Sequence, residues 1–212
     1  MKKLPKLVLL DRDGVINADV GAPGVIDPKQ LELTPHAGHA IARLKENGVS
    51  VAMITNQSCV GKGLISEVEL GVIQDHVQKL LQEQNELAVI DEIYQCTSTK
   101  EENDPRMKPN PGMLIEAMRD FGVKAPEECC FVGDTQTDLE AAIASKVPHR
   151  ILVSTGYGEG LMKGWAPEQP TPLSSNSDRE TDLPEDIFPI VYCKNLLEAV
   201  DWILSSPLDQ NH

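Results

Sequence analysis

Two carboxylates, Asp11 and Asp13, follow directly on the apolar run of residues 7–10 and come just before Gly14. An apolar run of this length is too short for a helix and is typical of a strand buried on both faces of a parallel sheet. Its carboxyl end then lies at the edge where open α/β sheets bind ligands. A carboxylate pair there can hold a divalent cation and leave one oxygen free to attack an electrophile. An ordinary acidic turn explains this segment equally well when it is taken alone.

Polar groups also follow a second apolar run, which covers 49–55 and ends at Thr55 and Asn56. A hydroxyl, a side-chain amide and main-chain N–H groups at a strand end suit the oxygens of a phosphate. Further along, Lys108 is followed by two nearby prolines, which stiffen the main chain and favour a fixed position for its ammonium group. A solvated lysine in a turn is the simpler interpretation of that segment alone.

A further pair of carboxylates, Asp134 and Asp138, comes after the apolar run 129–132. Aspartates near the start of a helix offset the positive end of its dipole, so helix capping by itself accounts for them. The alternative is a metal site, because carboxylates again stand where a strand ends. The joint pattern at several strand ends is much more specific than any one member and favours a single site.

The elements that would position these groups alternate between strands and helices. The expected strands cover 7–10, 49–55, 89–96, 129–132 and 150–153. The expected helices cover about 35–46 with Thr34 as N-cap, 67–84 after a capping box that begins at Ser66, and 196–204. A further helix is expected after residues 108–113, running through Met118 and ending at Phe121-Gly122, and another after Asp138 that carries Leu139, Ala142 and Ile143. This alternation predicts an α/β fold with a doubly wound, mostly parallel, Rossmann-like sheet that has helices on both faces.

One domain over residues 1–212 is expected from the length of the chain. The segment 163–189 is rich in Pro, Ser, Asp and Glu and is expected to be a long, partly mobile loop. The irregular segment 18–33 is expected to fold over the acidic turn as a flap. Short connections after Asn17 and Ser58 leave no room for a large cap domain, so we expect an open pocket.

The net charge of −14 argues against a nucleic-acid-binding protein, because affinity for a polyphosphate comes chiefly from lysine and arginine. A small phosphorylated metabolite remains compatible with an acidic chain that holds a metal ion. We expect no membrane association, since no apolar segment is long enough to span a bilayer. Five cysteines, two of them adjacent in an expected strand, indicate reduced thiols, and we expect a cytoplasmic monomer.

Four segments together carry a resemblance to the haloacid dehalogenase-superfamily phosphatases. They are Asp-Arg-Asp-Gly-Val-Ile-Asn at 11–17, Ile-Thr-Asn-Gln-Ser at 54–58, Lys-Pro-Asn-Pro-Gly-Met at 108–113 and Val-Gly-Asp-x-x-x-Asp at 132–138. Their order and approximate spacing are those of the family. Within it the chain resembles the branch of D,D-heptose 1,7-bisphosphate phosphatase and histidinol-phosphatase, and the similarity covers most of the chain up to about Gly160.

The resemblance implies a Mg²⁺-dependent phosphomonoester hydrolase that works through an aspartyl phosphate. Asp11 would be the nucleophile, and Asp13 would protonate the leaving oxygen and later deprotonate water. Thr55, Asn56 and Lys108 would hold the phosphoryl group. Mg²⁺ would be bound by Asp11, the main-chain carbonyl of Asp13, Asp134 and, directly or through water, Asp138. The implied substrate is a small sugar phosphate or bisphosphate, or a compound like histidinol phosphate.

Three positions depart from the family pattern. The heptose branch binds zinc in a cysteine- and histidine-rich loop, whereas here Cys96 is the only candidate ligand and Ser98 stands where histidine is expected, so we expect no structural zinc site. Met107 replaces a frequent arginine, for which Arg106 is a possible substitute, and Thr135 replaces a lysine or arginine. The loss of two cations weakens the inference to any particular bisphosphate.

Two other classes of protein stay open. A phospho-receiver-like regulatory module uses a similar set of carboxylates, threonine and lysine, but it is shorter and carries its phosphorylated aspartate at the end of an inner strand. A catalytically weak pseudoenzyme scaffold is suggested by Met107 and Thr135. A rapidly hydrolysed acyl phosphate would favour the enzyme, and a long-lived one the regulatory module. The scaffold predicts no Mg²⁺-dependent turnover of any phosphomonoester.

Overall fold

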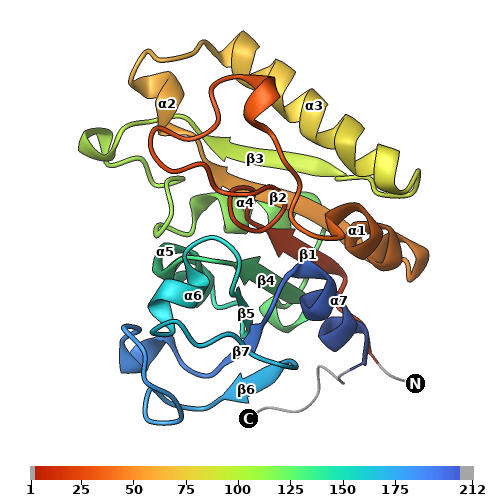
Figure 1. Cartoon of the computed structure of the whole chain (residues 1–212), viewed down its shortest axis with the longest axis vertical. Coiled ribbons are helices and arrows are strands. Elements are labelled where there is room, and N and C mark those ends of the chain that lie inside the picture. Colours follow the sequence, from red (N-terminus) through yellow and green to blue (C-terminus); the bar gives the residue numbers. More distant parts are fainter. Residues whose placement is uncertain (1–2, 206–212) are drawn as a thin grey trace.

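The computed structural model describes residues 3–205, which form a sheet of seven strands in the order β3-β2-β1-β4-β5-β7-β6 (Figure 1). All neighbouring strands are parallel except the antiparallel pair β6 and β7. The strands are β1 (Leu7–Leu10), β2 (Ser50–Asn56), β3 (Glu92–Cys96), β4 (Cys129–Gly133), β5 (His149–Val153), β6 (Thr171–Leu173) and β7 (Ile190–Cys193). The expected mostly parallel sheet is therefore confirmed.

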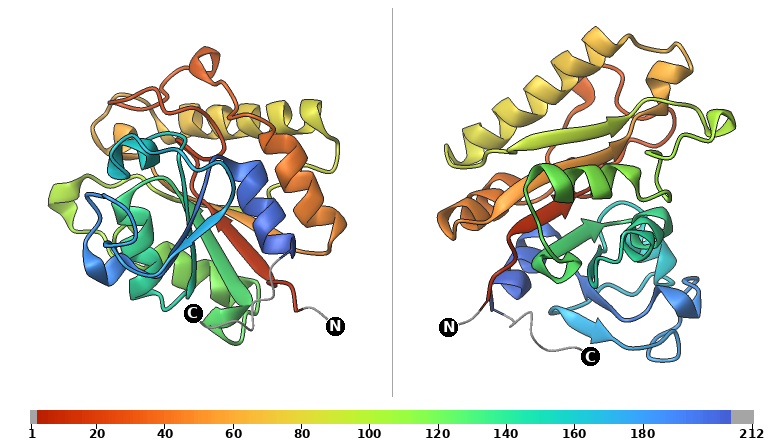
Figure 2. Two further views of the ribbon diagram at one scale, coloured as in Figure 1. Left: turned by 60° about the horizontal axis from the view of Figure 1, so that its bottom comes forward. Right: turned by 180° about the vertical axis from the view of Figure 1, so that it is seen from behind.

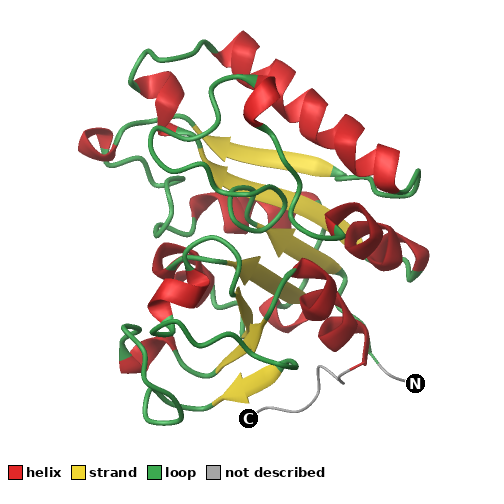
Figure 3. Ribbon diagram, in the orientation of Figure 1, coloured by secondary structure: helices red, strands yellow, loops and turns green. Residues whose placement is uncertain are grey.

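Helices cover both faces of this sheet (Figures 2 and 3). They are α1 (Ala37–Glu46), α2 (Ser58–Gly61), α3 (Glu67–Gln84), α4 (Gly112–Asp120), α5 (Gln136–Ala144), α6 (Gly158–Leu161) and α7 (Leu196–Ser205). Val8 and Leu10 of β1 belong to the same buried cluster as residues of α1, α3 and α7. Leu7 and Leu9 belong to a second cluster with residues of α4 and α5. Because successive side chains of a strand point to opposite faces, β1 needs an apolar residue at every position.

The two predicted helix starts have different outcomes. The capping box at α3 is confirmed, since the Glu69 N–H donates to Ser66 Oγ and the Ser66 N–H donates to the Glu69 carboxylate. The prediction of Thr34 as an N-cap is wrong. The helix α1 begins at Ala37 after His36, which has a positive φ of 62°. The buried Thr34 hydroxyl instead donates to the Val15 carbonyl at 2.6 Å, so a tertiary contact replaces the local cap.

The predicted loop 163–189 contains β6 and a single 3-10 turn at Glu185–Ile187. Leu173, Leu183 and Ile187 from this segment are buried in a cluster with Tyr192 of β7. Both β6 and β7 were missed by sequence reasoning. The strand β6 has only three residues and includes a proline, whereas the apolar run Ile190–Cys193 of β7 was an available signal. Over residues 3–205, no helix combines the length and the apolar character that crossing a bilayer requires.

Candidate active site

The site forms where β1, β2 and β4 end. The strand β1 lies between β2 and β4 and is parallel to both, so the carboxyl ends of these strands lie side by side. Asp11 follows β1, Thr55 and Asn56 close β2, and Asp134 follows β4. The first turn of α5 then contributes Asp138. Segments far apart in the chain therefore meet at one sheet edge, as the sequence predicts.

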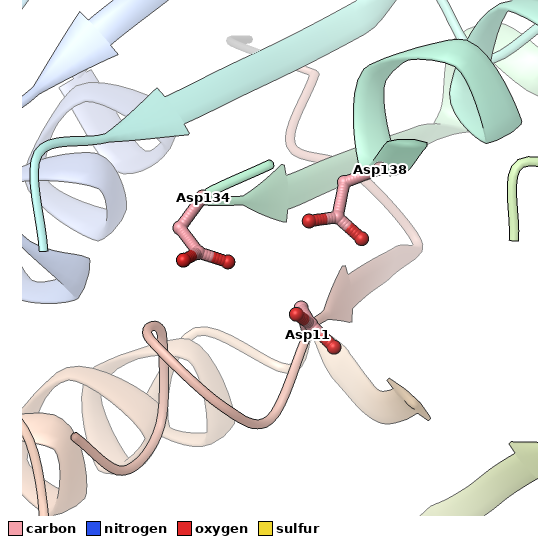
Figure 4. Close-up of side chains that lie close together, drawn as sticks. All are labelled: Asp11, Asp134 and Asp138. Carbon is pink, nitrogen blue, oxygen red and sulfur yellow. The ribbon is translucent and has the colours of Figure 1, made fainter. Parts of the chain in front are cut away.

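Three carboxylates, those of Asp11, Asp134 and Asp138, face one another across this edge (Figure 4). They offer one oxygen each, and these oxygens lie within 4.8 Å of one another. The three residues are only 7%, 1% and 0% exposed, respectively. Buried carboxylates so close together repel each other strongly unless a cation or protons neutralise them.

Lys108 supplies one of the neutralising charges. Its Nζ donates hydrogen bonds to Asp11 Oδ1 at 2.7 Å, to Asp138 Oδ1 at 2.6 Å and to the Ile54 carbonyl oxygen at 3.0 Å. Burial lowers the pKa of Lys108, but the two adjacent carboxylates outweigh burial, and the pKa rises above its usual value. The ammonium group is therefore firmly charged.

The remaining negative charge is not neutralised by the described side chains. Burial, followed by repulsion from Asp138, raises the pKa of Asp11 to about 7. Burial, followed by repulsion from Asp11 and Asp138, raises the pKa of Asp134 to about 9. In addition, Asp134 Oδ1 is buried without a hydrogen-bond partner. Clustered carboxylate oxygens with an unsatisfied acceptor fit a hard divalent cation such as Mg²⁺.

Two glycines leave the space that the Asp134 side chain occupies. A Cβ on Gly14 would lie 2.2 Å from Asp134 Oδ2, and a Cβ on Gly156 would lie 2.0 Å from the same oxygen. The Tyr157 N–H donates to Asp134 Oδ2 at 2.9 Å. The loop after β5 thus contributes to the site, although sequence reasoning treated it only as a flexible loop. The available signal was the cluster of glycines at 156, 158 and 160, directly after the expected strand 150–153.

The expected flap contacts this same loop. The carboxylate of Asp19 lies near the Tyr157 hydroxyl and raises the pKa of Tyr157. Asp19 belongs to the irregular segment 18–33. That segment therefore reaches the loop that holds Asp134, while its motion as a flap stays a prediction.

Asp13 lies beside the carboxylate cluster rather than in it. Its carboxylate accepts hydrogen bonds from Arg12 Nη2 at 2.9 and 3.1 Å, from Asn17 Nδ2 at 2.9 Å and from Gln57 Nε2 at 2.9 Å. The Arg12 side chain is fully buried, whereas that of Asp13 is 23% exposed. A partly exposed carboxylate at the rim is where an acid or base can reach a bound substrate.

The two polar residues at the end of β2 have different partners. Thr55 is 1% exposed, and its hydroxyl oxygen accepts a hydrogen bond from Gln57 Nε2 at 2.8 Å. Both ends of the Asn56 amide contact the main chain of Lys108 instead. The structure therefore brings Lys108 to the carboxylates and turns the Asn56 side chain toward Lys108. Sequence reasoning did not select Gln57, and its position directly after Thr55 and Asn56 was the only signal.

The positions that depart from the family pattern have structural partners. Arg106 forms an ion pair with Glu116, with 3.0 Å between Nε and Oε2, and Met107 is buried in the apolar cluster under β1. Thr135 is the N-cap of α5, and its hydroxyl donates to Asp138 Oδ2 at 2.6 Å. Thr135 thereby orients the carboxylate that Lys108 contacts. Asp138 therefore both takes part in the capping box of α5 and belongs to the carboxylate cluster.

The loop before Lys108 is organised by a carboxylate. Asp104 accepts hydrogen bonds from the Ser98 hydroxyl at 2.6 Å and from the Arg106 N–H at 2.8 Å. Its main-chain carbonyl accepts another from Asn110 Nδ2 at 2.9 Å. These contacts hold together the loop between β3 and α4, for which the sequence predicts no zinc site.

Comparison with known proteins agrees with this site. The model of the haloacid dehalogenase-like hydrolase family matches residues 8–146. The chain is 34% identical to the D-glycero-beta-D-manno-heptose-1,7-bisphosphate 7-phosphatase of Haemophilus influenzae over 168 residues, which cover 74% of this chain and 88% of that protein. It is also 34% identical to the D-glycero-alpha-D-manno-heptose-1,7-bisphosphate 7-phosphatase of Mycobacterium bovis over 159 residues, with 75% and 80% covered.

A solved structure extends the similarity to the fold. The crystal structure of D,D-heptose 1,7-bisphosphate phosphatase from B. bronchiseptica, complexed with magnesium and phosphate, matches with a TM-score of 0.77 and 29% identity. The match covers 94% of this chain and 98% of that one. The resemblance inferred from the four motifs is thus confirmed. Since the family model matches well over half of the sequence, this chain belongs to the haloacid dehalogenase-like hydrolase family and is a phosphatase within it.

Proposed function

We propose that this protein is a Mg²⁺-dependent phosphatase that hydrolyses a heptose 1,7-bisphosphate through an aspartyl-phosphate intermediate. The convergence of Lys108 with the carboxylates of Asp11, Asp134 and Asp138 is the observation that carries the proposal. Two relatives that align over most of their length are heptose-1,7-bisphosphate 7-phosphatases, and this supports the substrate class. A dianionic phosphate needs a strongly cationic environment before a carboxylate can attack it.

The cation would be held by Asp11, Asp134 and the main-chain carbonyl of Asp13, with Asp138 close by. When bound, Mg²⁺ supplies charge neutralisation and Lewis-acid polarisation of the phosphoryl oxygens. The unpartnered Asp134 Oδ1 and the raised pKa values of Asp11 and Asp134 are what such an ion would relieve. Segment 97–107 contains no cysteine and no histidine, and we propose that it binds no structural zinc.

In the first step an Asp11 carboxylate oxygen attacks phosphorus, and the bond from phosphorus to the ester oxygen breaks. Asp13 gives its proton to that oxygen, so it leaves as a hydroxyl group rather than an alkoxide, on a sugar that keeps its other phosphate. Lys108 and the Thr55 hydroxyl orient and neutralise the transferring group. We assign Asn56 an indirect part, because its amide holds the main chain of Lys108.

In the second step Asp13 takes a proton from water, and the water oxygen attacks the phosphorus of the acyl phosphate. The bond between Asp11 and phosphorus breaks, and inorganic phosphate leaves. Asp13 is then protonated and ready for another cycle. Its position next to the cluster, with a partly exposed side chain, suits proton exchange with both the substrate and water.

A substrate panel tests the proposal. It contains both anomers of heptose 1,7-bisphosphate, histidinol phosphate and p-nitrophenyl phosphate, each assayed with Mg²⁺ and with a chelator. We expect a heptose bisphosphate to show the highest kcat/KM, and only with Mg²⁺. Asp11→Asn should lower turnover by about 1,000-fold or more, whereas Asp75→Asn on the exposed side of α3 should leave it unchanged.

Three outcomes would contradict the proposal. Turnover by Asp11→Asn at the parental rate would overturn the nucleophile assignment. The absence of Mg²⁺-dependent turnover of every phosphomonoester would favour a pseudoenzyme scaffold. An acyl phosphate on Asp11 that persists for many minutes would favour a phospho-receiver-like switch.

A further inference from the structure

We propose that Gln57 is a positioning residue that holds the acid–base carboxylate of Asp13 and the hydroxyl of Thr55 in one fixed relation. Its Nε2 donates to Asp13 Oδ2 at 2.9 Å and to Thr55 Oγ1 at 2.8 Å. One amide nitrogen therefore spans two groups that act on different parts of the substrate, the leaving oxygen and the phosphoryl group. The inference rests on the proposed function, which assigns those roles.

The chemistry of its neighbours fixes the orientation of the Gln57 amide. Its Nε2 faces a carboxylate and a hydroxyl oxygen, while its Oε1 lies 3.8 Å from the Cys59 thiol, a weak donor. Turning the amide over would place Oε1 against the Asp13 carboxylate, where two acceptors repel. The amide therefore has one satisfactory orientation, in which both donors serve the site.

The main chain under this amide is also fixed. The Gln57 N–H donates to the Cys96 carbonyl at the end of β3 at 2.7 Å, and the residue is 3% exposed. A side chain that is buried and bonded at both ends keeps its partners within a narrow range of positions. Through these hydrogen bonds Gln57 connects the ends of β2 and β3 to the turn after β1.

Gln57 differs from the other donors to Asp13 in where it comes from. Arg12 and Asn17 belong to the same turn as Asp13 and move with it. Gln57 belongs to the segment after β2, next to Thr55. Without Gln57, Asp13 keeps donors in its own turn but loses its direct connection to the phosphate-binding end of β2.

The same hydrogen bond sets the direction in which Thr55 donates. A hydroxyl that accepts from Gln57 Nε2 must direct its own hydrogen elsewhere. That hydrogen is then available to an oxygen of a bound phosphoryl group. Loss of Gln57 frees the hydroxyl to rotate, which weakens phosphate binding for every substrate alike.

Substrates with different leaving groups distinguish displacement of Asp13 from loss of the Thr55 orientation. An alkyl phosphate expels an alkoxide that needs the Asp13 proton, whereas p-nitrophenolate is stable enough to leave without one. A misplaced Asp13 should therefore slow an alkyl phosphate much more than an aryl phosphate. The parameter kcat/KM reports the steps through alcohol release, before hydrolysis of the common acyl phosphate.

The experiment compares kcat/KM for heptose 1,7-bisphosphate and p-nitrophenyl phosphate in the parental enzyme and in Gln57→Met and Gln57→Asn. We expect each variant to lose about 100-fold on the alkyl substrate and less than about 10-fold on the aryl substrate. The matched control is Gln74→Met, since Gln74 is also a buried glutamine whose Nε2 donates to a side chain, that of Gln95 at 3.3 Å. It should change both substrates by the same small factor.

Equal losses on both substrates, or no loss, would overturn the inference while the parental activity upholds the proposed function. If Gln57→Met does not fold, Gln57→Asn carries the same comparison, because it retains an amide that is too short to span both partners. A parental protein that turns over neither substrate would overturn the proposed function and this inference with it.

Discussion

Asn56 holds the main chain of Lys108 through both ends of its amide. The Lys108 N–H donates to Asn56 Oδ1 at 3.0 Å, and Asn56 Nδ2 donates to the Lys108 carbonyl at 3.0 Å. Asn56→Ala should therefore lower kcat/KM by about 10-fold or more, because Lys108 loses two hydrogen bonds and its ammonium shifts from Asp11. Steady-state kinetics on p-nitrophenyl phosphate measures this loss.

Asn110→Ala is the matched control for this prediction. Asn110 lies in the same loop, and its Nδ2 donates to the Asp104 carbonyl rather than to a residue of the cluster. We expect it to retain most of the activity. Equal losses in the two variants would show that the loop, and not the Asn56 contact, is responsible.

The stability of the metal-free protein should fall as pH rises. Burial raises the pKa of Asp11 to about 7 and that of Asp134 to about 9, from 3.8 in both cases. The folded state thus binds protons more tightly than the unfolded chain, and this stabilisation is complete below about pH 4 and is lost as pH rises through these values. Denaturant unfolding in a chelator from about pH 5 to pH 9 measures it.

The same titration in Asp134→Asn provides the comparison. The free energy of unfolding of this variant should depend less on pH, because only Asp11 still contributes from the pair. Saturating Mg²⁺ should also flatten the parental curve, since the cation replaces the protons. A parental protein in chelator that gains stability toward pH 9 would contradict the prediction.

Mg²⁺ should stabilise the parental protein and not Asp134→Asn. At 100 times the dissociation constant, a ligand that binds only the folded state adds about 2.7 kcal/mol, which corresponds to a rise in Tm of roughly 5–10 °C for a chain of this size. Asp75→Asn, in an exposed position of α3, should keep the full shift. A Mg²⁺ shift of parental size in Asp134→Asn would place the cation elsewhere.

Gly156→Ala should disrupt the cluster through steric overlap. The added Cβ would lie 2.0 Å from Asp134 Oδ2 and 2.8 Å from the Gly14 Cα, and the φ of +62° disfavours any side chain. We expect Mg²⁺-dependent activity to fall by at least about 100-fold as Asp134 is displaced. Activity and Mg²⁺-induced thermal shifts measure the effect.

Gly160→Ala in the neighbouring α6 separates this overlap from a general intolerance of alanine. A Cβ there meets nothing within 4 Å, and alanine favours a helix over glycine. Its activity and Mg²⁺ shift should equal those of the parent. Parental behaviour of Gly156→Ala would mean that the loop after β5 yields without moving Asp134.

The sequence by itself determined five strands, β1 to β5, and the polar groups that follow them. Apolar runs bounded by polar turns predict β1, β2 and β4, and the carboxylates and hydroxyl that follow them predict one shared edge. These features depend on side-chain periodicity and on near neighbours, which a linear sequence contains in full. The four motifs predicted the family because their residues, order and approximate spacing are contained in the sequence itself.

Only the tertiary structure decided which groups are partners. Lys108 and Asp11 are 97 residues apart, and their contact depends on how the segment before α4 returns to β1. The Thr34 hydroxyl binds a carbonyl of a distant turn instead of capping α1, and Gly156 reaches Asp134 from the loop after β5. Hydrogen bonds and close approaches of this kind depend on strand register and crossover paths, because many partners are chemically equivalent until the fold brings one within reach.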